Sequence, residues 1–381
     1  MSPSIRSASA STRSICCSGR NVGRVAAPVH DAFGVYVHIP FCSRRCDYCA
    51  FATWTDRHHL IEEYLEQLCV DVARAVADGM PRATSVFVGG GTPTLVTPTG
   101  LASVIESIPV DDAAEITVES NPDDVTVDMM RTFRSAGVNR ISIGVQSMVE
   151  HVLDSLGRSH VPANVVRAVD AVRTAGIPTF NLDLIYGAAG ETVSDWERTV
   201  AGALALEPSH VSAYALTIEA GTPLAGQPER HPDDDDLADK YELADDMLTA
   251  AGLANYEVSN WARPGHECRH NALYWQQGDY RGFGSAAHSH RGGHRWWNVR
   301  TPERYIAAVR DGEPTEAAGE ELDPETQRIE GLQLALRTRD GVPVESLDAD
   351  VLPGLVERDG ERLVLTRSGR LLANEVSLRL R

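Results

Sequence analysis

The sequence predicts an α/β fold built on a parallel sheet of about six strand and helix units. Apolar runs typical of buried strands alternate with segments of helical period along most of the chain. Three tripeptides, 136–138, 175–177 and 251–253, also place a glycine where a helix would end in a left-handed cap. Such a sheet can be open and doubly wound, or it can form a full or partial barrel.

The predicted elements begin with a strand over 33–39, which ends at Pro40 because proline cannot donate to a sheet. Helices are expected over 60–77 and 100–108. The periodicity predicts the other strands over 85–88, 115–119, 140–145, 179–185 and 210–218. The C-terminal pattern is a helix over 326–336, a turn at 341–343, a hairpin around 355–365 and a final helix, which resembles a small winged-helix domain.

The composition of the chain argues against some classes of function. The chain has 381 residues, 43% of them apolar, and a formal net charge of -19. This charge argues against binding along a nucleic-acid backbone, which needs clustered Lys and Arg. No stretch approaches the roughly 18 apolar residues of a membrane span. Seven cysteines, three of them close together, suit a reducing compartment. We therefore expect a soluble cytoplasmic protein.

Cys42, Cys46 and Cys49 form a CxxxCxxC array on the loop after the first strand. Thiolates at this spacing can bind one metal centre. A structural zinc site takes four protein ligands, whereas three thiolates on a four-iron cluster leave one iron open. The spacing favours a [4Fe-4S] cluster. The alternatives are a zinc site completed by His38 or His58, or three structural cysteines.

This array and the motifs around it resemble the radical S-adenosylmethionine (SAM) proteins. The motifs are YVHIPF at 36–41, GGGTPT at 89–94, ESNP at 119–122, GVQS at 144–147, GR at 157–158 and DLIYG at 183–187. In this order they are similar to the branch that contains oxygen-independent coproporphyrinogen III oxidase and the HemW-type heme chaperones. The resemblance spans roughly residues 33 to 381 and implies a partial (β/α)6 barrel, similar to a TIM barrel.

The resemblance also implies that SAM binds the open iron through its amino and carboxylate groups, and that an electron donor reduces the cluster. It assigns cofactor binding to Tyr36, Tyr48, Gly90, Gly91, Thr92, Glu119, Gln146, Arg158 and Asp183. The chemistry agrees, since glycines let a backbone approach a ligand, a carboxylate accepts from an ammonium or hydroxyl, and a guanidinium binds a carboxylate with two hydrogen bonds. Without the resemblance, these side chains could equally cap a sheet or form surface ion pairs.

Two features favour the heme chaperones within this branch. The oxidases carry a fourth cysteine two positions after the third, whereas Ala50 and Phe51 follow Cys49 here. The segment 270–275 carries the HNxxYW pattern that the resemblance associates with heme, which assigns heme binding to His270, Asn271, Tyr274 and Trp275. A neutral imidazole can ligate iron and aromatic rings can line a porphyrin. Without the resemblance, His270 would be interpreted as a hydrogen-bonded core or loop histidine.

The leading interpretation is a chaperone that binds heme and transfers it to apo-hemoproteins. The alternatives are the decarboxylating oxidase, a radical enzyme that modifies tRNA, and a structural zinc protein. The tRNA enzyme would need a basic RNA-binding module, which the acidic composition does not provide. Cys268 is expected to be an inert buried thiol. His288, His290 and His294 either contact the cofactor or porphyrin or only cover the mouth of the barrel, and they are left unassigned.

These interpretations divide the chain into four segments. We expect a disordered leader over 1–30, a radical SAM barrel over 31–230, an extension with the HNxxYW pattern over 231–322, and a winged-helix-like domain over 323–381. The leader contains repeated Ser and Arg and no acidic residue, as an organelle-targeting segment does, but it lacks the amphipathic stripe of such a segment. The alternatives to a disordered leader are a targeting segment and a misread upstream start.

Overall fold

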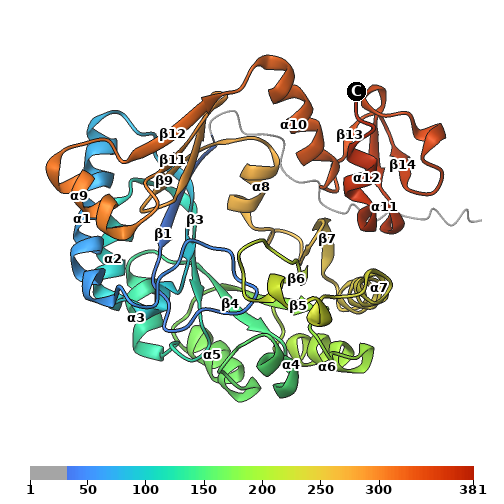
Figure 1. Cartoon of the computed structure of the whole chain (residues 1–381), viewed down its shortest axis with the longest axis horizontal. Coiled ribbons are helices and arrows are strands. Elements are labelled where there is room, and N and C mark those ends of the chain that lie inside the picture. The colour runs from blue at the N-terminus through green and yellow to red at the C-terminus, as the bar shows by residue number, and fades with distance from the viewer. Residues whose placement is uncertain (1–31) are drawn as a thin grey trace, which may run out of the picture.

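The computed structural model describes residues 32–381, so the expected leader over 1–30 lies outside the described residues. Six strands form the centre of one twelve-stranded sheet in chain order, and all their neighbouring pairs are parallel. They are β1 (Phe33–Ile39), β2 (Ala83–Gly90), β3 (Val110–Ser120), β4 (Arg140–Gln146), β5 (Thr179–Tyr186) and β6 (His210–Ala215). β1 and β6 pair with other strands instead of with each other, which makes the barrel partial, as predicted (Figure 1).

Helices cover the outer face of these strands (Figure 1). They are α1 (Ile61–Ala77), α2 (Pro98–Ser107), α3 (Val127–Ser135), α4 (Glu150–Ser155), α5 (Pro162–Thr174), α6 (Val193–Leu204) and α7 (Asp234–Ala250). Alternate side chains of a strand point to opposite faces. In β1, the apolar residues Val35, Val37 and Ile39 belong to the main core, whereas Tyr36 and His38 line a cavity on the inner side. The three predicted glycine caps are confirmed, with φ between +75° and +95°.

Six further strands widen the sheet on both sides of the barrel. On one side lie β7 (Ala254–Glu257) and β8 (Asn260–Ala262); on the other lie β9 (Asp279–Phe283), β10 (His288–Arg291), β11 (His294–Asn298) and β12 (Glu316–Glu321). β9 pairs parallel with β1, and β10 to β12 continue antiparallel. α9 (Pro302–Asp311) connects β11 to β12. The sequence did not predict these strands, and β6 ends at Ala215, three residues before its predicted end.

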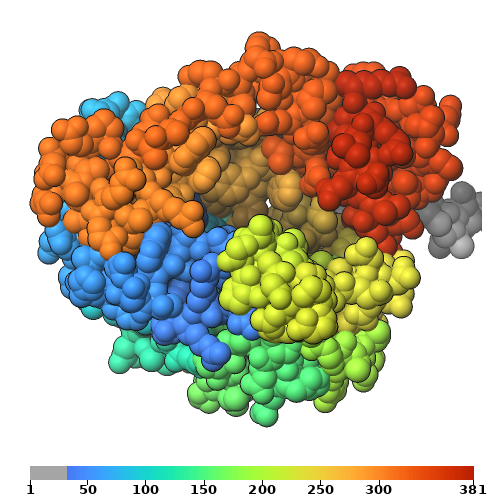
Figure 2. Space-filling view, in the orientation of Figure 1, coloured from blue at the N-terminus to red at the C-terminus, as the bar shows by residue number. Residues whose placement is uncertain are grey.

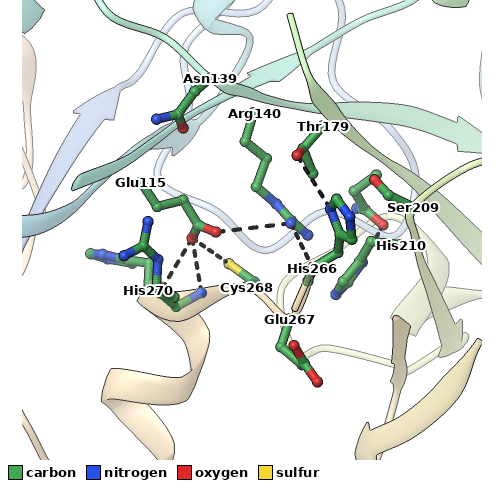
Figure 3. Close-up of polar contacts among 12 residues, drawn as sticks. Glu115, Asn139, Arg140, Thr179, Ser209, His210, His266, Glu267, Cys268 and His270 are labelled. Carbon is green, nitrogen blue, oxygen red and sulfur yellow. Dashed lines mark hydrogen bonds and ion pairs between the residues drawn. The ribbon is translucent and has the colours of Figure 1, made fainter. Parts of the chain in front are cut away.

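Hydrogen bonds hold the short helix α8 (Arg269–Trp275) and the segment before it at the N-terminal ends of the barrel strands (Figure 3). Glu115 of β3 accepts hydrogen bonds from the backbone N–H groups of Arg269 at 2.8 Å and His270 at 3.4 Å. Arg140 of β4 donates to the backbone carbonyl of His266 at 2.9 Å. The HNxxYW segment is therefore held at the barrel end opposite to the end where the cysteine loop leaves β1.

The chain ends in a small unit with its own hydrophobic cluster, which includes Leu336, Val342, Leu363 and Val376. Its elements are α10 (Pro324–Leu336), β13 (Val342–Pro343), β14 (Val356–Asp359), β15 (Arg362–Leu365), α11 (Arg367–Leu371) and α12 (Ala373–Ser377). Their order matches the predicted helix, turn, hairpin and final helix. The likeness to a winged helix, and the exact segment boundaries, stay predictions.

Candidate cofactor site

The cysteine loop lies over the C-terminal ends of the strands. The loop is closed by hydrogen bonds from the Cys42 N–H to the Trp54 carbonyl at 3.1 Å and from the Trp54 N–H to the Pro40 carbonyl at 2.8 Å. Cys42, Cys46 and Cys49 are free, partly exposed thiols, and all three line one cavity of about 480 Å³. Three thiols on one cavity wall with open space in front of them fit a cluster that keeps one iron free for a ligand.

The glycine motif at the end of β2 allows this strand end to pass directly beneath the loop. Gly90 has a φ of +106°, and a Cβ there would lie 2.4 Å from the His38 ring. At Gly91 a Cβ would lie 2.6 Å from the Phe41 carbonyl oxygen and 3.1 Å from the Cys42 Sγ. No larger residue fits without displacing the loop. Both glycines and Thr92 line the cavity, and the Thr92 hydroxyl lies 3.6 Å from the Cys42 Sγ.

Two partly buried carboxyl groups face this cavity, Glu119 from β3 and Asp183 from β5, on either side of β4. Glu119 accepts from the Gly90 N–H at 3.3 Å, and burial together with the nearby Asp183 raises the pKa of Glu119 to about 8. Asp183 accepts from the Ser142 hydroxyl and the Asn181 amide, each at 2.7 Å, while burial raises its pKa. Carboxyl groups held this way can accept from the hydroxyl or amino groups of a ligand.

Arg158, Gln146 and Tyr48 complete the predicted set around the cavity. The Arg158 guanidinium donates to the Asn121 side-chain oxygen at 3.0 Å and lies 3.5 Å from the Cys46 Sγ. Gln146 ends β4 with a φ of +61°, a conformation that costs energy in any residue other than glycine and that is concentrated at functional sites. The structure thus brings eight of the nine predicted cofactor residues to one cavity, together with the three cysteines.

Tyr36 is the exception, because it lines a neighbouring cavity. Its hydroxyl is hydrogen-bonded to His38 Nδ1 at 3.0 Å, and His38 Nε2 is bonded to the Ala52 carbonyl at 2.9 Å. Both ring nitrogens of His38 are thus occupied, which disfavours the zinc alternative that used it. His58 Nε2 is likewise bonded to the Cys42 carbonyl at 2.9 Å.

The four predicted heme contacts lie on α8. His270 is buried, with Nδ1 bonded to the Ser85 hydroxyl at 3.0 Å and Nε2 bonded to the Tyr274 hydroxyl at 2.8 Å. Burial lowers the pKa of His270 to about 3, so the ring is neutral. In this arrangement neither nitrogen is free for iron. Tyr274 lines the neighbouring cavity, whereas Asn271 and Trp275 are half-buried outside its lining. Cys268 is buried with a pKa raised to about 12, as expected of an inert thiol.

Sequence reasoning missed several residues of the cofactor cavity. Asn121 belongs to the ESNP motif, but its contact with Arg158 could not be inferred from the motif alone. Ser142 points inward from β4, two residues before Gly144, which is in register with Asp183, so strand alternation could have suggested it. Tyr214 of β6, which the strand pattern places near the C-terminal ends of the strands, also lines the cavity. The segment from Ala215 to Glu219 follows β6 and closes one side of the cavity.

Comparisons with known proteins show which family this chain belongs to. Residues 36–201 match the radical SAM superfamily. The heme chaperone HemW of Mycobacterium tuberculosis is 41% identical over 364 residues, which cover 90% of this chain and 93% of that protein. The chain belongs to the HemW family of radical SAM proteins. The heme chaperone HemW of Bacillus subtilis is 32% identical and matches 90% of this chain and 97% of its own length.

A solved structure shows the same fold. Coproporphyrinogen III oxidase (HemN) from Escherichia coli superposes with a TM-score of 0.79 over 91% of this chain and 89% of its own, at 23% identity. Membership of the radical SAM superfamily implies a [4Fe-4S] cluster and SAM. Within residues 32–381, no helix is both long and apolar enough to span a membrane.

We expect the affinity for SAM to depend on pH through Glu119. With a pKa of about 8, its carboxyl group is mostly protonated at pH 7. The positive charge of bound SAM would stabilise the Glu119 carboxylate and lower this pKa, so binding should release a proton from Glu119. We expect the affinity to rise with pH up to about 8 and then level off.

Anaerobic calorimetry of the cluster-loaded protein in two buffers of different ionisation enthalpy measures the proton count. The SAM amino group titrates in every sample, so the comparison with Glu119→Gln isolates the carboxyl group. Equal proton release by the parent and the variant at pH 7 would contradict the expectation.

Proposed function

We propose that this protein binds heme and transfers it to apo-hemoproteins, using a radical SAM barrel as its scaffold. The observation that carries the proposal is the match to the M. tuberculosis heme chaperone, which is 41% identical and covers 93% of that protein. Heme, an apo-hemoprotein recipient and an electron donor for the cluster are the partners that this function requires. The proposed compartment is the cytoplasm.

Cys42, Cys46 and Cys49 would hold the cluster. Gly90, Gly91, Thr92, Glu119, Gln146, Arg158 and Asp183 surround the place where SAM would bind, and Tyr48 closes it from the loop. A reduced cluster supplies one electron that can cleave a carbon-sulfur bond of SAM. The residues of this chain would orient the cofactor: Arg158 would bind its carboxylate, and the carboxyl groups of Glu119 and Asp183 would accept from its amino and hydroxyl groups.

The second candidate is the decarboxylation of coproporphyrinogen III, because the superposed structure is that oxidase. Residue 51 argues against the oxidase function. The oxidase pattern has a cysteine at this position, whereas Phe51 here exposes 65% of its surface at the rim of the cofactor cavity. A phenyl ring offers no ligand or redox group, but it can pack on a flat aromatic ligand.

Anaerobic incubation with coproporphyrinogen III, SAM and a reductant distinguishes the two functions. The protein should carry an intact cluster, and the products should be separated by chromatography. We expect no protoporphyrinogen IX, together with stoichiometric heme binding in a parallel titration. Protoporphyrinogen IX formed over several turnovers would support the oxidase instead.

A further inference from the structure

A second cavity, of about 590 Å³, lies beside the cofactor site. This volume falls within the range of about 300 to 1,000 Å³ that is usual for small-molecule sites. Its walls come from β1, α8, the strands β9 to β11, α10 and the end of the cysteine loop. Figure 2 shows the molecule hollowed between the blue loop segment, the orange strands and the orange-red C-terminal part.

Aromatic side chains dominate the walls of this cavity. Tyr36, Tyr274 and Tyr280 line it, and the ring centroids of Tyr274 and Tyr280 lie 4.6 Å apart with their planes nearly perpendicular. Ala50 and Phe51 line both this cavity and the cofactor cavity, so a ligand here would lie directly beside the cluster loop. Flat aromatic walls suit a flat aromatic ligand.

The hairpin of β10 and β11 presents one face to this cavity. His288 is paired opposite Trp297, and His290 is paired opposite Arg295. Residues two apart on a strand share a face, and His288, His290 and Arg295 all line the cavity. His294 lies on the other face, where its ring stacks on Trp296 and its Nδ1 lies 2.7 Å from a carboxylate oxygen of Glu321.

Of the imidazoles that line this cavity, His288 is the most accessible to a metal. Both nitrogens of His38 are hydrogen-bonded, and His290 is almost buried with its Nδ1 bonded to the Gly278 carbonyl at 3.0 Å. His288 is exposed, and its ring makes no hydrogen bond to another residue of 32–381. The ring stacks on Trp297 at a centroid distance of 5.7 Å, which fixes its orientation. Partial burial lowers its pKa and keeps it neutral, as a ligand must be.

We propose that heme binds in this second cavity with His288 as an axial ligand of its iron. The inference rests on the proposed function and names the site where it occurs. Tyr274 and Phe51 would contact the porphyrin. Arg295 already pairs with Glu330 at 2.8 Å, so it is not assigned to a propionate group.

This placement gives the HNxxYW segment a positioning role. The His270 Nε2 holds the Tyr274 hydroxyl, and the Tyr274 ring forms part of the cavity wall. His270 therefore acts on the ligand through Tyr274, with its own nitrogens kept inside the protein. Replacing His270 should weaken heme binding without removing the imidazole signature of bound iron.

Heme titration of the parent and four variants tests the site, with the absorption spectrum and electron paramagnetic resonance of ferric heme as readouts. The variants are His288→Ala, His288→Gly, His270→Gln and the matched control His294→Ala on the opposite face of the hairpin. We expect His288→Ala to lose the imidazole signature and to bind heme at least about tenfold more weakly. His294→Ala should behave as the parent, and free imidazole should restore the signature of His288→Gly.

The outcomes of this titration test the heme site and the proposed function separately. Parent protein that binds no heme would overturn the proposed function. If the parent protein binds heme and His288→Ala matches it in affinity and spectrum, only this site is overturned. Loss of the imidazole signature in His270→Gln would show that the axial ligand of the iron is His270 on α8. Iron content and melting temperature confirm that each variant is folded, and rescue by imidazole requires a formed cavity.

Discussion

Cys46→Ala is expected to lose its iron-sulfur cluster almost completely. Two thiolates cannot hold a four-iron cluster that already leaves one iron without a protein ligand, so the iron content after anaerobic reconstitution should fall from about four atoms per chain to near zero. Cys46 is chosen because its Sγ faces the cavity and lies 3.5 Å from the Arg158 guanidinium. SAM binding through the open iron should disappear with the cluster.

Cys69→Ala is the matched control for this loss. Cys69 is also a free, partly buried thiol, but it lies on α1 away from the cavity. This variant should keep the iron content and the absorption of the parent. A Cys46→Ala protein with the full iron content of the parent would contradict the assignment of the cluster ligands.

Lys240→Met is expected to destabilise the protein by about 3 to 5 kcal/mol, the usual effect of breaking a buried ion pair from one side. The Lys240 ammonium is completely buried and lies 3.2 Å from the Glu191 carboxylate, which is also buried, and 2.6 Å from Asp236. Without Lys240, Glu191 keeps only the Gly187 N–H, at 2.7 Å, as a hydrogen-bond donor among the described residues. This pair joins α7 to the segment that follows β5.

Urea unfolding followed by tryptophan fluorescence measures this effect, because Trp196 donates to the Lys240 carbonyl at 2.8 Å and reports on the same region. Arg131→Met is the control. Its exposed pair with Asp128, at 3.3 Å, should contribute less than about 1 kcal/mol. Equal stabilities of the two variants would contradict the importance of the buried pair.

The barrel was predictable because its strands and helix ends have recognisable sequence patterns. β1 is an almost continuous apolar run that ends at a proline, and the glycines that follow α3, α5 and α7 adopt the left-handed conformation expected of helix ends. The cofactor residues were predictable for a related reason. In a parallel sheet, side chains at the ends of successive strands meet at one edge, and their motifs resemble a known family.

The added strands were not predictable in the same way. β12 has the sequence EAAGEE and is exposed along its whole length, so neither apolar alternation nor β-branched residues mark it. β10 and β11 have the sequences HSHR and HRWWN, which show no alternation of apolar and polar residues. Their two faces become distinct only when the pairing of His288 with Trp297 is known. The histidines of this hairpin therefore had no role at the level of sequence.

The HNxxYW segment shows that a sequence motif does not by itself identify which of its residues binds a ligand. Its residue types suit a heme ligand, and nothing in the sequence shows that Glu115 and Ser85 fasten this helix to the N-terminal ends of the strands. Whether His270 touches iron depends on this tertiary arrangement, in which both of its nitrogens are already bonded. Tyr274, four residues later on the same helix, reaches the cavity.

The central claim is that this protein carries heme for delivery. The most direct test mixes the heme-loaded, cluster-containing protein with a heme-free hemoprotein under anaerobic conditions, separates the two by size, and measures heme in each. We predict one heme per chain before mixing, and a gain of heme by the acceptor that stays the same when albumin is added to capture free heme. Heme that stays with the donor, or that reaches the acceptor only by way of solution, would contradict the claim.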